Sequence, residues 1–261
     1  MNRAGKVYLI GAGPGDPELM TLRAVRMLAQ ADAVVFDRLV SPEIMKTVPR
    51  DARLVPVGKT PGAHTVTQDR INEILAGLAC AGLTVARLKG GDPMIFGRGS
   101  EEAAYLSARG IAVEYAPGIT SAQGAAAATG VPLTHRGLAG GVQYVTGHRQ
   151  AGHPLDLDWK RLADPDTTLV VYMGVANIGQ IALRLIAEGM PSGLPVMAIA
   201  NATTPREARL ITRLDRVAVD LRDWPVLGPV LFFIGRVVSL YSGPGQIVHD
   251  LPRHLIAAAN A

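Results

Sequence analysis

Cysteine, aromatic residues and charge are all scarce in this sequence, and each shortage excludes a class of protein. The single cysteine, Cys80, excludes a disulfide within these 261 residues and favours a reducing compartment, so we expect a cytoplasmic protein. Aromatic residues make up 5% of the sequence, too few for a surface that stacks nucleic-acid bases. The formal charge of +4 comes without any dense basic run, so we expect an anionic small molecule as partner and no nucleic acid.

Long hydrophobic runs are missing as well. The apolar residues 7–10 end at Gly11 and are followed by Pro14 and Asp16, a pattern typical of a strand and not of a signal peptide. Residues 115–134 carry no charge over a length that suits a membrane span, but two prolines and many small residues keep their hydrophobicity low. We therefore expect no membrane partner.

Signals for metal binding and for nucleophilic catalysis are weak or absent. His148 and His153 lie five residues apart with no cysteine beside them, so we expect no metal site. The sequence has neither a Gly-x-Ser-x-Gly elbow nor a Gly-x-x-x-x-Gly-Lys phosphate loop. The sequence therefore lacks the motifs that most directly indicate acyl transfer or nucleotide hydrolysis.

Aliphatic residues and glycine dominate what is present. Short β-branched runs alternate with helical patterns, which predicts an α/β fold, and the shorter spacings of the second half predict a mixed sheet. We expect strands near residues 7–10, 33–36, 53–57, 84–88, 112–116, 142–146, 168–173, 195–200, 208–213 and 229–235. The rhythm pauses after Pro132, so we expect an N-terminal domain over 1–135, a C-terminal domain over 136–245, and a tail over 246–261.

Two helices have clear start signals. Thr67 is the expected N-cap of a helix that Gly82 ends, and Cys80 is expected to be buried on its apolar side. Asp16 is the expected N-cap of a second helix, with Pro17 in its first turn. We expect the apolar face of this second helix at Leu19, Leu22 and Val25.

Two glycine-rich loops of similar design follow predicted strands. Gly11-Ala12-Gly13-Pro14-Gly15-Asp16-Pro17 lacks the third glycine of a dinucleotide fingerprint, because Asp16 stands in its place and opposes a pyrophosphate. The segment Gly91-Asp92-Pro93 repeats its Gly-Asp-Pro turn within the glycine-rich loop of residues 89–99, so both loops can line one crevice at the same sheet edge. Asp92 is either a turn cap or a ligand contact, and the sequence leaves both open.

Charged residues gather just past the same strands. Asp37 and Arg38 follow one predicted strand and Lys59 follows another; surface ion pairing is the alternative explanation for such loop charges. Arg98, Glu101 and the pair His135-Arg136 add further charge near the glycine loops. Because a guanidinium binds a carboxylate through two hydrogen bonds, the arginines point to a substrate with several carboxylates.

Several segments together resemble the tetrapyrrole methylases, a family of S-adenosylmethionine-dependent enzymes, over about residues 5–241. The segments are 7–17, Asp37–Pro42, Val57–Lys59, Arg87–Gly99, Pro117–Ser121, Pro132–Arg136, Tyr172–Gly174, Thr203–Pro205 and Ile234–Val238. The resemblance implies two α/β domains with a cofactor cleft between them, and usually a homodimer.

The pattern is most similar to members that act on uroporphyrinogen III. It implies methylation of carbons 2 and 7 by S-adenosylmethionine, giving precorrin-2 by way of precorrin-1, with S-adenosylhomocysteine as the other product. A later corrin-ring (precorrin) methyltransferase is the nearest alternative, because the whole family shares the glycine loops. Lys59 and the segment Thr134-His135-Arg136 favour uroporphyrinogen III. A nicotinamide oxidoreductase and a noncatalytic tetrapyrrole-binding protein are more distant alternatives.

The resemblance also implies roles for individual residues. Asp37 is the implied acid/base carboxylate, Lys59 the implied proton donor, and Arg98 the candidate for removing the proton after methyl transfer. Arg98, Glu101 and Arg136 match substrate-binding positions. The implied cofactor contacts are Pro14, Gly90, Gly91, Asp92, Ile95, Thr120, Ser121, Met173, Ala202 and Val230 or Leu231.

Two departures from the family pattern affect these expectations. Glu207 stands where many relatives carry glutamine, beside the cofactor contact expected at Ala202. The sequence also begins at the first glycine loop, so we expect no fused dehydrogenase and ferrochelatase module and a reaction that stops at precorrin-2. The sequence leaves open whether precorrin-2 then serves the formation of cobalamin, sirohaem or another modified tetrapyrrole.

Overall fold

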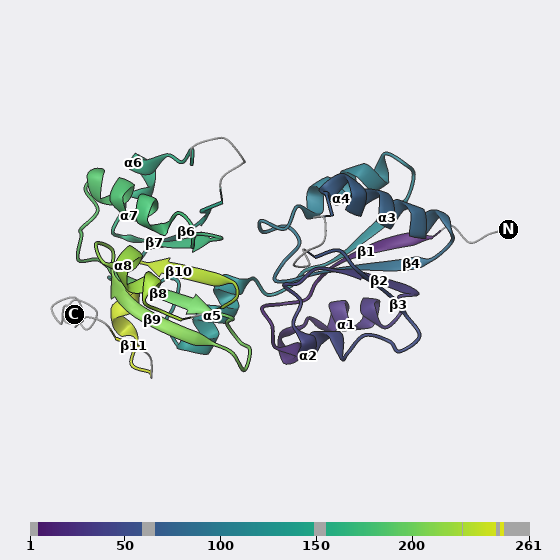
Figure 1. The fold of residues 1–261 in the computed structure, drawn as a ribbon, viewed down its shortest axis with the longest axis horizontal. Coiled ribbons are helices and arrows are strands. Elements are labelled where there is room, and N and C mark those ends of the chain that lie inside the picture. Colours follow the sequence, from purple (N-terminus) through teal and green to yellow (C-terminus); the bar gives the residue numbers. More distant parts are fainter. Residues whose placement is uncertain (1–4, 59–65, 149–154, 226, 244–245, 248–261) are drawn as a thin grey trace. The chain divides into compact units, whose positions relative to one another are not determined.

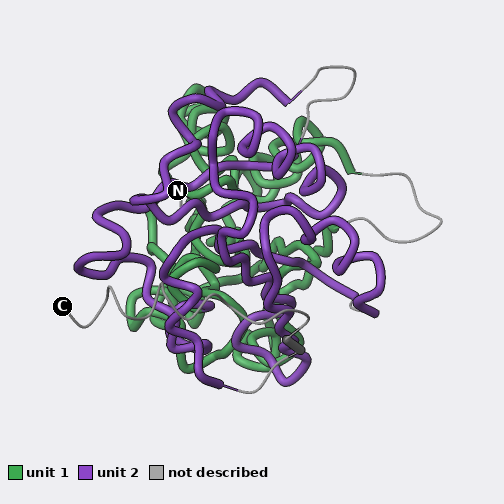
Figure 2. Tube along the Cα trace, turned by 90° about the vertical axis from the view of Figure 1, so that its left-hand side faces the viewer, with its two compact units in different colours: residues 1–124 green, residues 125–261 purple. Residues whose placement is uncertain are grey.

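The computed structural model describes residues 5–58, 66–148, 155–225, 227–243 and 246–247. The chain falls into two compact units, Met1–Gly124 and Ala125–Ala261, which Figure 2 colours separately. This division lies inside helix α5 (Ser121–Thr129), and the domain limits expected at residues 135 and 245 stay predictions. Within the described residues no helix is both long and apolar enough to cross a membrane.

Unit 1 is built on a fully parallel five-stranded sheet in the order β3-β2-β4-β1-β5. Its strands are β1 (Lys6–Gly11), β2 (Ala33–Phe36), β3 (Arg53–Pro56), β4 (Thr84–Lys89) and β5 (Ala112–Ala116). Helices α3 (Gln68–Cys80) and α4 (Gly99–Ser107) cover one face of the sheet, and α1 (Leu22–Leu28) and α2 (Pro42–Met45) cover the other (Figure 1). Alternate residues of the inner strands β1, β2 and β4 enter the two cores, as the period of two requires.

Unit 2 contains a mixed six-stranded sheet in the order β11-β9-β8-β10-β7-β6. Its strands are β6 (Gly141–Thr146), β7 (Thr167–Tyr172), β8 (Pro195–Ala200), β9 (Ala208–Arg213), β10 (Val230–Ile234) and β11 (Gln246–Ile247). The β6–β7 and β9–β11 pairs are parallel and the others antiparallel, which confirms the predicted mixed sheet. Helices α6 (Trp159–Leu162), α7 (Ile178–Ala187) and α8 (Val217–Arg222) accompany it, and the 3-10 helix η2 (Arg236–Leu240) follows β10. The tail expected at 246–261 is described only at Gln246–Ile247, which forms β11.

The predicted strands are confirmed, with ends that differ by at most one residue. Thr67 caps α3 as expected, since its side chain accepts a hydrogen bond from the Arg70 amide. Cys80 is exposed, so its predicted burial is wrong: it lies at the last position of α3, which faces away from the sheet.

The second helix prediction is wrong in part. Asp16 caps only a short 3-10 helix, η1 (Pro17–Leu19), and Thr21 caps α1, which begins at Leu22. This break changes which face is buried: Leu22 is 90% exposed and Val25 is 46% exposed. The side chains that α1 buries instead are Ala24, Met27 and Leu28.

Candidate active site

The loops predicted to bind ligand meet at one edge of the unit 1 sheet. Because the strands are parallel, β1, β2, β4 and β5 all end at this edge, and the register pairs Gly11 with Lys89 and Phe36 with Leu88. The two glycine loops are joined directly: Gly13 and Gly91 exchange backbone hydrogen bonds of 3.2 and 2.7 Å. The expectation that both loops line one edge is confirmed.

Backbones without side chains pack closely at this junction. A Cβ on Gly118 would lie 2.1 Å from the Gly91 carbonyl oxygen, and one on Gly11 would lie 2.4 Å from the Gly118 nitrogen. These neighbours are backbone atoms, which cannot give way, so Gly118 and Gly11 need glycine, while Gly91 favours it because its φ is +67°. The structure thus holds bare peptide groups from three loops side by side, an arrangement that suits a ligand bound through backbone contacts.

Asp16 and Asp92 have the same local role. The Asp16 carboxylate accepts a hydrogen bond from the Glu18 amide at 2.9 Å, and the Asp92 carboxylate accepts one from the Met94 amide at 2.7 Å. Asp92 does more, because its other oxygen accepts a 3.0 Å hydrogen bond from the Gly118 amide. It therefore fixes the glycine loop after β5 to the loop after β4, and the turn-cap interpretation of Asp92 is confirmed.

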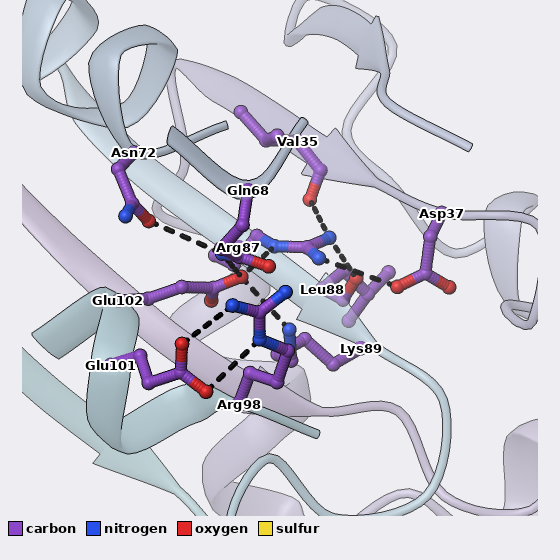
Figure 3. A network of polar contacts seen from close by, with 10 residues as sticks. All are labelled: Val35, Asp37, Gln68, Asn72, Arg87, Leu88, Lys89, Arg98, Glu101 and Glu102. Carbon is purple, nitrogen blue, oxygen red and sulfur yellow. Dashed lines mark hydrogen bonds and ion pairs between the residues drawn. The ribbon is translucent and has the colours of Figure 1, made fainter. Parts of the chain in front are cut away.

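A buried polar network lies beneath these loops (Figure 3). Arg87 and Lys89 sit two residues apart on β4, so they share a face, and this face packs against α3 and α4. Both side chains bind one oxygen of Glu102 from α4, which accepts from Arg87 Nε at 3.2 Å and from Lys89 Nζ at 2.9 Å. Gln68 of α3 donates to the same oxygen at 3.1 Å.

The network reaches Asp37, the expected acid/base residue. Arg87 Nη2 lies 3.4 Å from Asp37 Oδ2, while Asp37 Oδ1 accepts a 3.0 Å hydrogen bond from the Leu39 amide. Burial lowers the pKa of Lys89, the positive charge of Arg87 lowers it further, and Glu102 opposes both effects. This network was not predicted, although two cations at alternate positions of a buried strand are a signal for it.

Arg98 and Glu101 form a second, exposed pair at the start of α4. Arg98 donates to both carboxylate oxygens of Glu101, at 3.0 and 2.6 Å, and each side chain is more than half exposed. The hydrogen bond with Arg98 lowers the pKa of Glu101, and the same bond raises the pKa of Arg98. This pair holds the guanidinium near the glycine loop, where its outer edge is open to solvent.

In each unit, left-handed backbone conformations occur at or next to expected site residues in the sequence. Among the described non-glycine residues, five have a positive φ: Phe96, Arg98, Met173, Asn201 and Thr203. Arg98 and Met173 are predicted site residues, Phe96 follows the predicted contact Ile95, and the other two flank Ala202. Such conformations cost about 1–3 kcal/mol each and cluster at functional sites, so their placement supports the predicted site.

The expected cofactor contacts of unit 2 lie on its strands or at their ends. Met173 follows β7 and is half exposed, Ala202 follows β8, and Leu231 on β10 is buried. Glu207 closes the loop around Ala202: one carboxylate oxygen accepts a 2.7 Å hydrogen bond from the Thr203 amide, and the other pairs with Arg209. The Glu207 carboxylate therefore has structural partners on both of its oxygens within this part of unit 2.

Arg136 lines a cavity of about 490 Å³ in unit 2, together with His135 and Arg236. Arg236 forms an ion pair with Asp166 and donates to the Leu138 carbonyl at 3.2 Å. The pairing of Arg236 with Asp166 was not predicted, because the two residues lie 70 positions apart and no local pattern links them. Lys59, the expected proton donor, lies outside the described residues.

The sequence and the fold are similar to those of known proteins. The family model of the Tetrapyrrole (Corrin/Porphyrin) Methylases matches residues 6–218. The chain is 57% identical to the uroporphyrinogen-III C-methyltransferase of Paracoccus denitrificans, over 90% of this chain and 82% of that protein. It is 49% identical to the S-adenosyl-L-methionine-dependent uroporphyrinogen III methyltransferase of Arabidopsis thaliana, over 90% of this chain and 64% of that protein.

The fold is also similar to that of a solved structure. The uroporphyrin-III C-methyl transferase of Thermus thermophilus, complexed with S-adenyl homocysteine, matches with a TM-score of 0.78 and 41% identity, over 92% of this chain and 96% of that one. Other curated relatives are named siroheme synthases, and the chain spans about half of their length.

Proposed function

This chain belongs to the tetrapyrrole (corrin/porphyrin) methylases, and from that premise we propose that it transfers methyl groups from S-adenosylmethionine to uroporphyrinogen III. The methyl groups go to carbons 2 and 7, so that precorrin-1 forms first and precorrin-2 second. The loop after β4 carries the proposal: closely packed glycine backbones stand at its start and an exposed arginine at its end. In this proposal the loop after β4 contacts both the methyl donor and the carboxylate-rich acceptor.

The glycine junction fits S-adenosylmethionine. We assign its binding to Pro14, Gly90, Gly91, Asp92, Ile95, Thr120 and Ser121, with Met173, Ala202 and Val230 or Leu231 as further contacts. The close packing of Gly11 and Gly118 supports this assignment, because a side chain at either position would collide with backbone atoms of a neighbouring loop. When bound, S-adenosylmethionine supplies a methyl group that its sulfonium makes strongly electrophilic.

Arginines account for the recognition of the acceptor. Uroporphyrinogen III carries eight carboxylates, and a guanidinium binds a carboxylate through two parallel hydrogen bonds. We assign substrate binding to Arg98, Glu101 and Arg136. The bidentate Arg98–Glu101 pair supports this, because it presents the guanidinium at a fixed place while both side chains stay more than half exposed. Arg136 lines the cavity that it shares with His135 and Arg236.

The protein has to align a pyrrole carbon with the methyl group and to manage one proton in each methylation. We assign the acid/base role to Asp37, proton donation to Lys59, and removal of the ring proton to Arg98. The position of Asp37 at the ligand-binding edge, with its carboxylate held by the Leu39 amide and by Arg87, supports its role. A charged guanidinium cannot accept a proton, so Arg98 first has to pass one to the Glu101 carboxylate, to which it is hydrogen-bonded, and then takes the ring proton in its place.

We also propose a homodimer that works in the cytoplasm. The exposed thiol of Cys80 favours a reducing compartment, and the family resemblance favours the dimer. Light scattering on the purified protein measures the molecular mass in solution. A mass of one chain at the concentrations used for activity would contradict the dimer.

The decisive assay incubates the purified protein with uroporphyrinogen III and methyl-labelled S-adenosylmethionine without oxygen. Mass spectrometry should show a product with one labelled methyl group at early times and one with two at late times, together with S-adenosylhomocysteine. Asp37→Asn should lower the rate and leave the order of products unchanged. If uroporphyrinogen III gains no mass while a later precorrin does, the protein is a later corrin-ring methyltransferase and the proposal is wrong.

A further inference from the structure

Glu102 is a fully buried carboxylate to which the proposed reaction gives no role. It has 0% exposure and lies in the first turn of α4. One of its oxygens accepts hydrogen bonds from Arg87, Lys89 and Gln68, while its other oxygen has no hydrogen-bond partner among the described residues (Figure 3). A buried carboxylate is costly unless it is paired, so the three donors on one oxygen need an explanation.

The geometry of Arg87 explains why Glu102 is held by three donors. Glu102 fixes the Nε of Arg87, and the carbonyls of Val35 and Leu88 accept from its Nη1 at 3.5 and 3.2 Å. Because the guanidinium is planar and rigid, fixing two of its nitrogens also fixes the third. That third nitrogen, Nη2, is the one that lies 3.4 Å from Asp37.

We propose that Glu102 is a positioning residue for Asp37: it fixes the guanidinium of Arg87, and Arg87 in turn fixes the Asp37 carboxylate at the sheet edge. The inference rests on the proposed function, since the acid/base role of Asp37 comes from there. Arg87 is 3% exposed and the Asp37 side chain is 25% exposed, so the chain of contacts runs from the core outward to the site.

The charges of the network support this role. Two cations, Arg87 and Lys89, are balanced by two carboxylates, Glu102 and Asp37, so the network has no net formal charge. Without the Glu102 charge, two buried cations would repel each other and Arg87 would lose its anchor at Nε. Burial and the Arg87 charge already lower the pKa of Lys89, while Glu102 raises it and so helps to keep the ammonium charged.

The test uses Glu102→Gln, which keeps the size of the side chain and removes its charge. We expect kcat to fall between about 10-fold and 100-fold, because a small displacement of a catalytic group has that effect, while KM and the Kd of S-adenosylhomocysteine stay within about twofold. Glu102→Asp keeps the charge and should recover part of the loss. Glu73→Gln removes an exposed carboxylate that pairs with Arg70 on α3, and this control should leave kcat unchanged.

A double-mutant cycle separates positioning from a general structural effect. In the Asp37→Asn background, Glu102→Gln should cause no further loss of kcat, because the group that it positions is already disabled. An equal loss in both backgrounds, or unchanged kcat in a folded Glu102→Gln protein, would overturn the proposal.

An NMR measurement that needs no turnover tests the positioning role of Glu102 independently of the proposed function. In the wild-type protein, the NMR signals of the Arg87 side-chain NH groups should shift on Asp37→Asn. In Glu102→Asp, and in Glu102→Gln if it folds, that response should be weaker. If the wild-type protein fails to methylate uroporphyrinogen III but shows this coupling, the proposed substrate is wrong and the positioning role stands. If the signals respond equally with and without the Glu102 carboxylate, the positioning role is wrong.

Discussion

Glu101 and Glu102 are neighbours in the first turn of α4, yet they occupy opposite environments. The Glu101 side chain is 54% exposed and binds Arg98, whereas Glu102 is fully buried and binds Arg87 and Lys89. Successive helical residues point about 100° apart, so one turn places one carboxylate in the core and the next at the surface. The start of α4 thus orders two arginines, Arg98 at the exposed surface and Arg87 in the core beside Asp37.

Arg98→Ala should damage turnover far more than cofactor affinity. The guanidinium is exposed beyond the glycine loop and is assigned to the tetrapyrrole, so we expect kcat to fall about 100-fold or more. Calorimetry with S-adenosylhomocysteine should give a nearly unchanged Kd. Arg109→Ala, at the other end of α4, is the matched control and should leave both quantities intact. An equal loss of cofactor binding in Arg98→Ala would contradict the placement of this side chain.

Glu101 should titrate below its ordinary range, because its hydrogen bond with Arg98 lowers its pKa. The folded-state pKa of Glu101 lies below the unfolded value of about 4.3, so above about pH 4.3 the Arg98–Glu101 pair adds to the free energy of unfolding. This added stability is lost as the pH falls through the folded-state pKa. The energy is small because both groups are exposed. NMR titration should show the Glu101 pKa moving up in Arg98→Ala. The same titration curve in both proteins would disprove the pairing in solution.

Lys89 should make the protein more stable as the pH rises. Its folded-state pKa is lowered, chiefly by burial, so the unfolded chain binds more protons between that pKa and the unfolded value of about 10.4. The free energy of unfolding should therefore increase across this window in the wild-type protein and increase less in Lys89→Met. Urea unfolding at a series of pH values measures the difference. Lys46→Met, on the surface, should keep the wild-type slope; a wild-type slope in Lys89→Met would refute the prediction.

Gly118→Ala and Gly77→Ala should change stability in opposite directions. A Cβ at Gly118 meets the backbone of the neighbouring glycine loop at 2.1 Å, so we expect a loss of about 1–3 kcal/mol together with weaker binding of S-adenosylhomocysteine. A Cβ at Gly77, on the exposed side of α3, meets nothing within 4 Å, so we expect a gain of about 0.5–1 kcal/mol. Denaturant unfolding and calorimetry check both. Unchanged cofactor binding in Gly118→Ala would show that the junction does not hold the cofactor.

The sequence by itself determined the strands, the capped helix α3 and the paired glycine loops. These features depend on neighbouring residues: the alternation of apolar side chains, the N-cap Thr67, and glycines followed by Asp-Pro. The similarity of those loops to a known family was also enough to indicate the cofactor and the substrate class. The loop residues Asp16 and Asp92 behave alike because each caps its own turn.

Only the tertiary structure decided which side chains are buried and which charges meet. Leu22 and Cys80 are exposed although their own sequence patterns indicated burial, because the sheet covers other positions of their helices. Arg87 meets Glu102 from 15 residues away and Asp37 from 50 residues away, and no local pattern encodes such distances. A buried charge is stable only beside its partner, and it is the packing of β4 against α4 that brings the partner there.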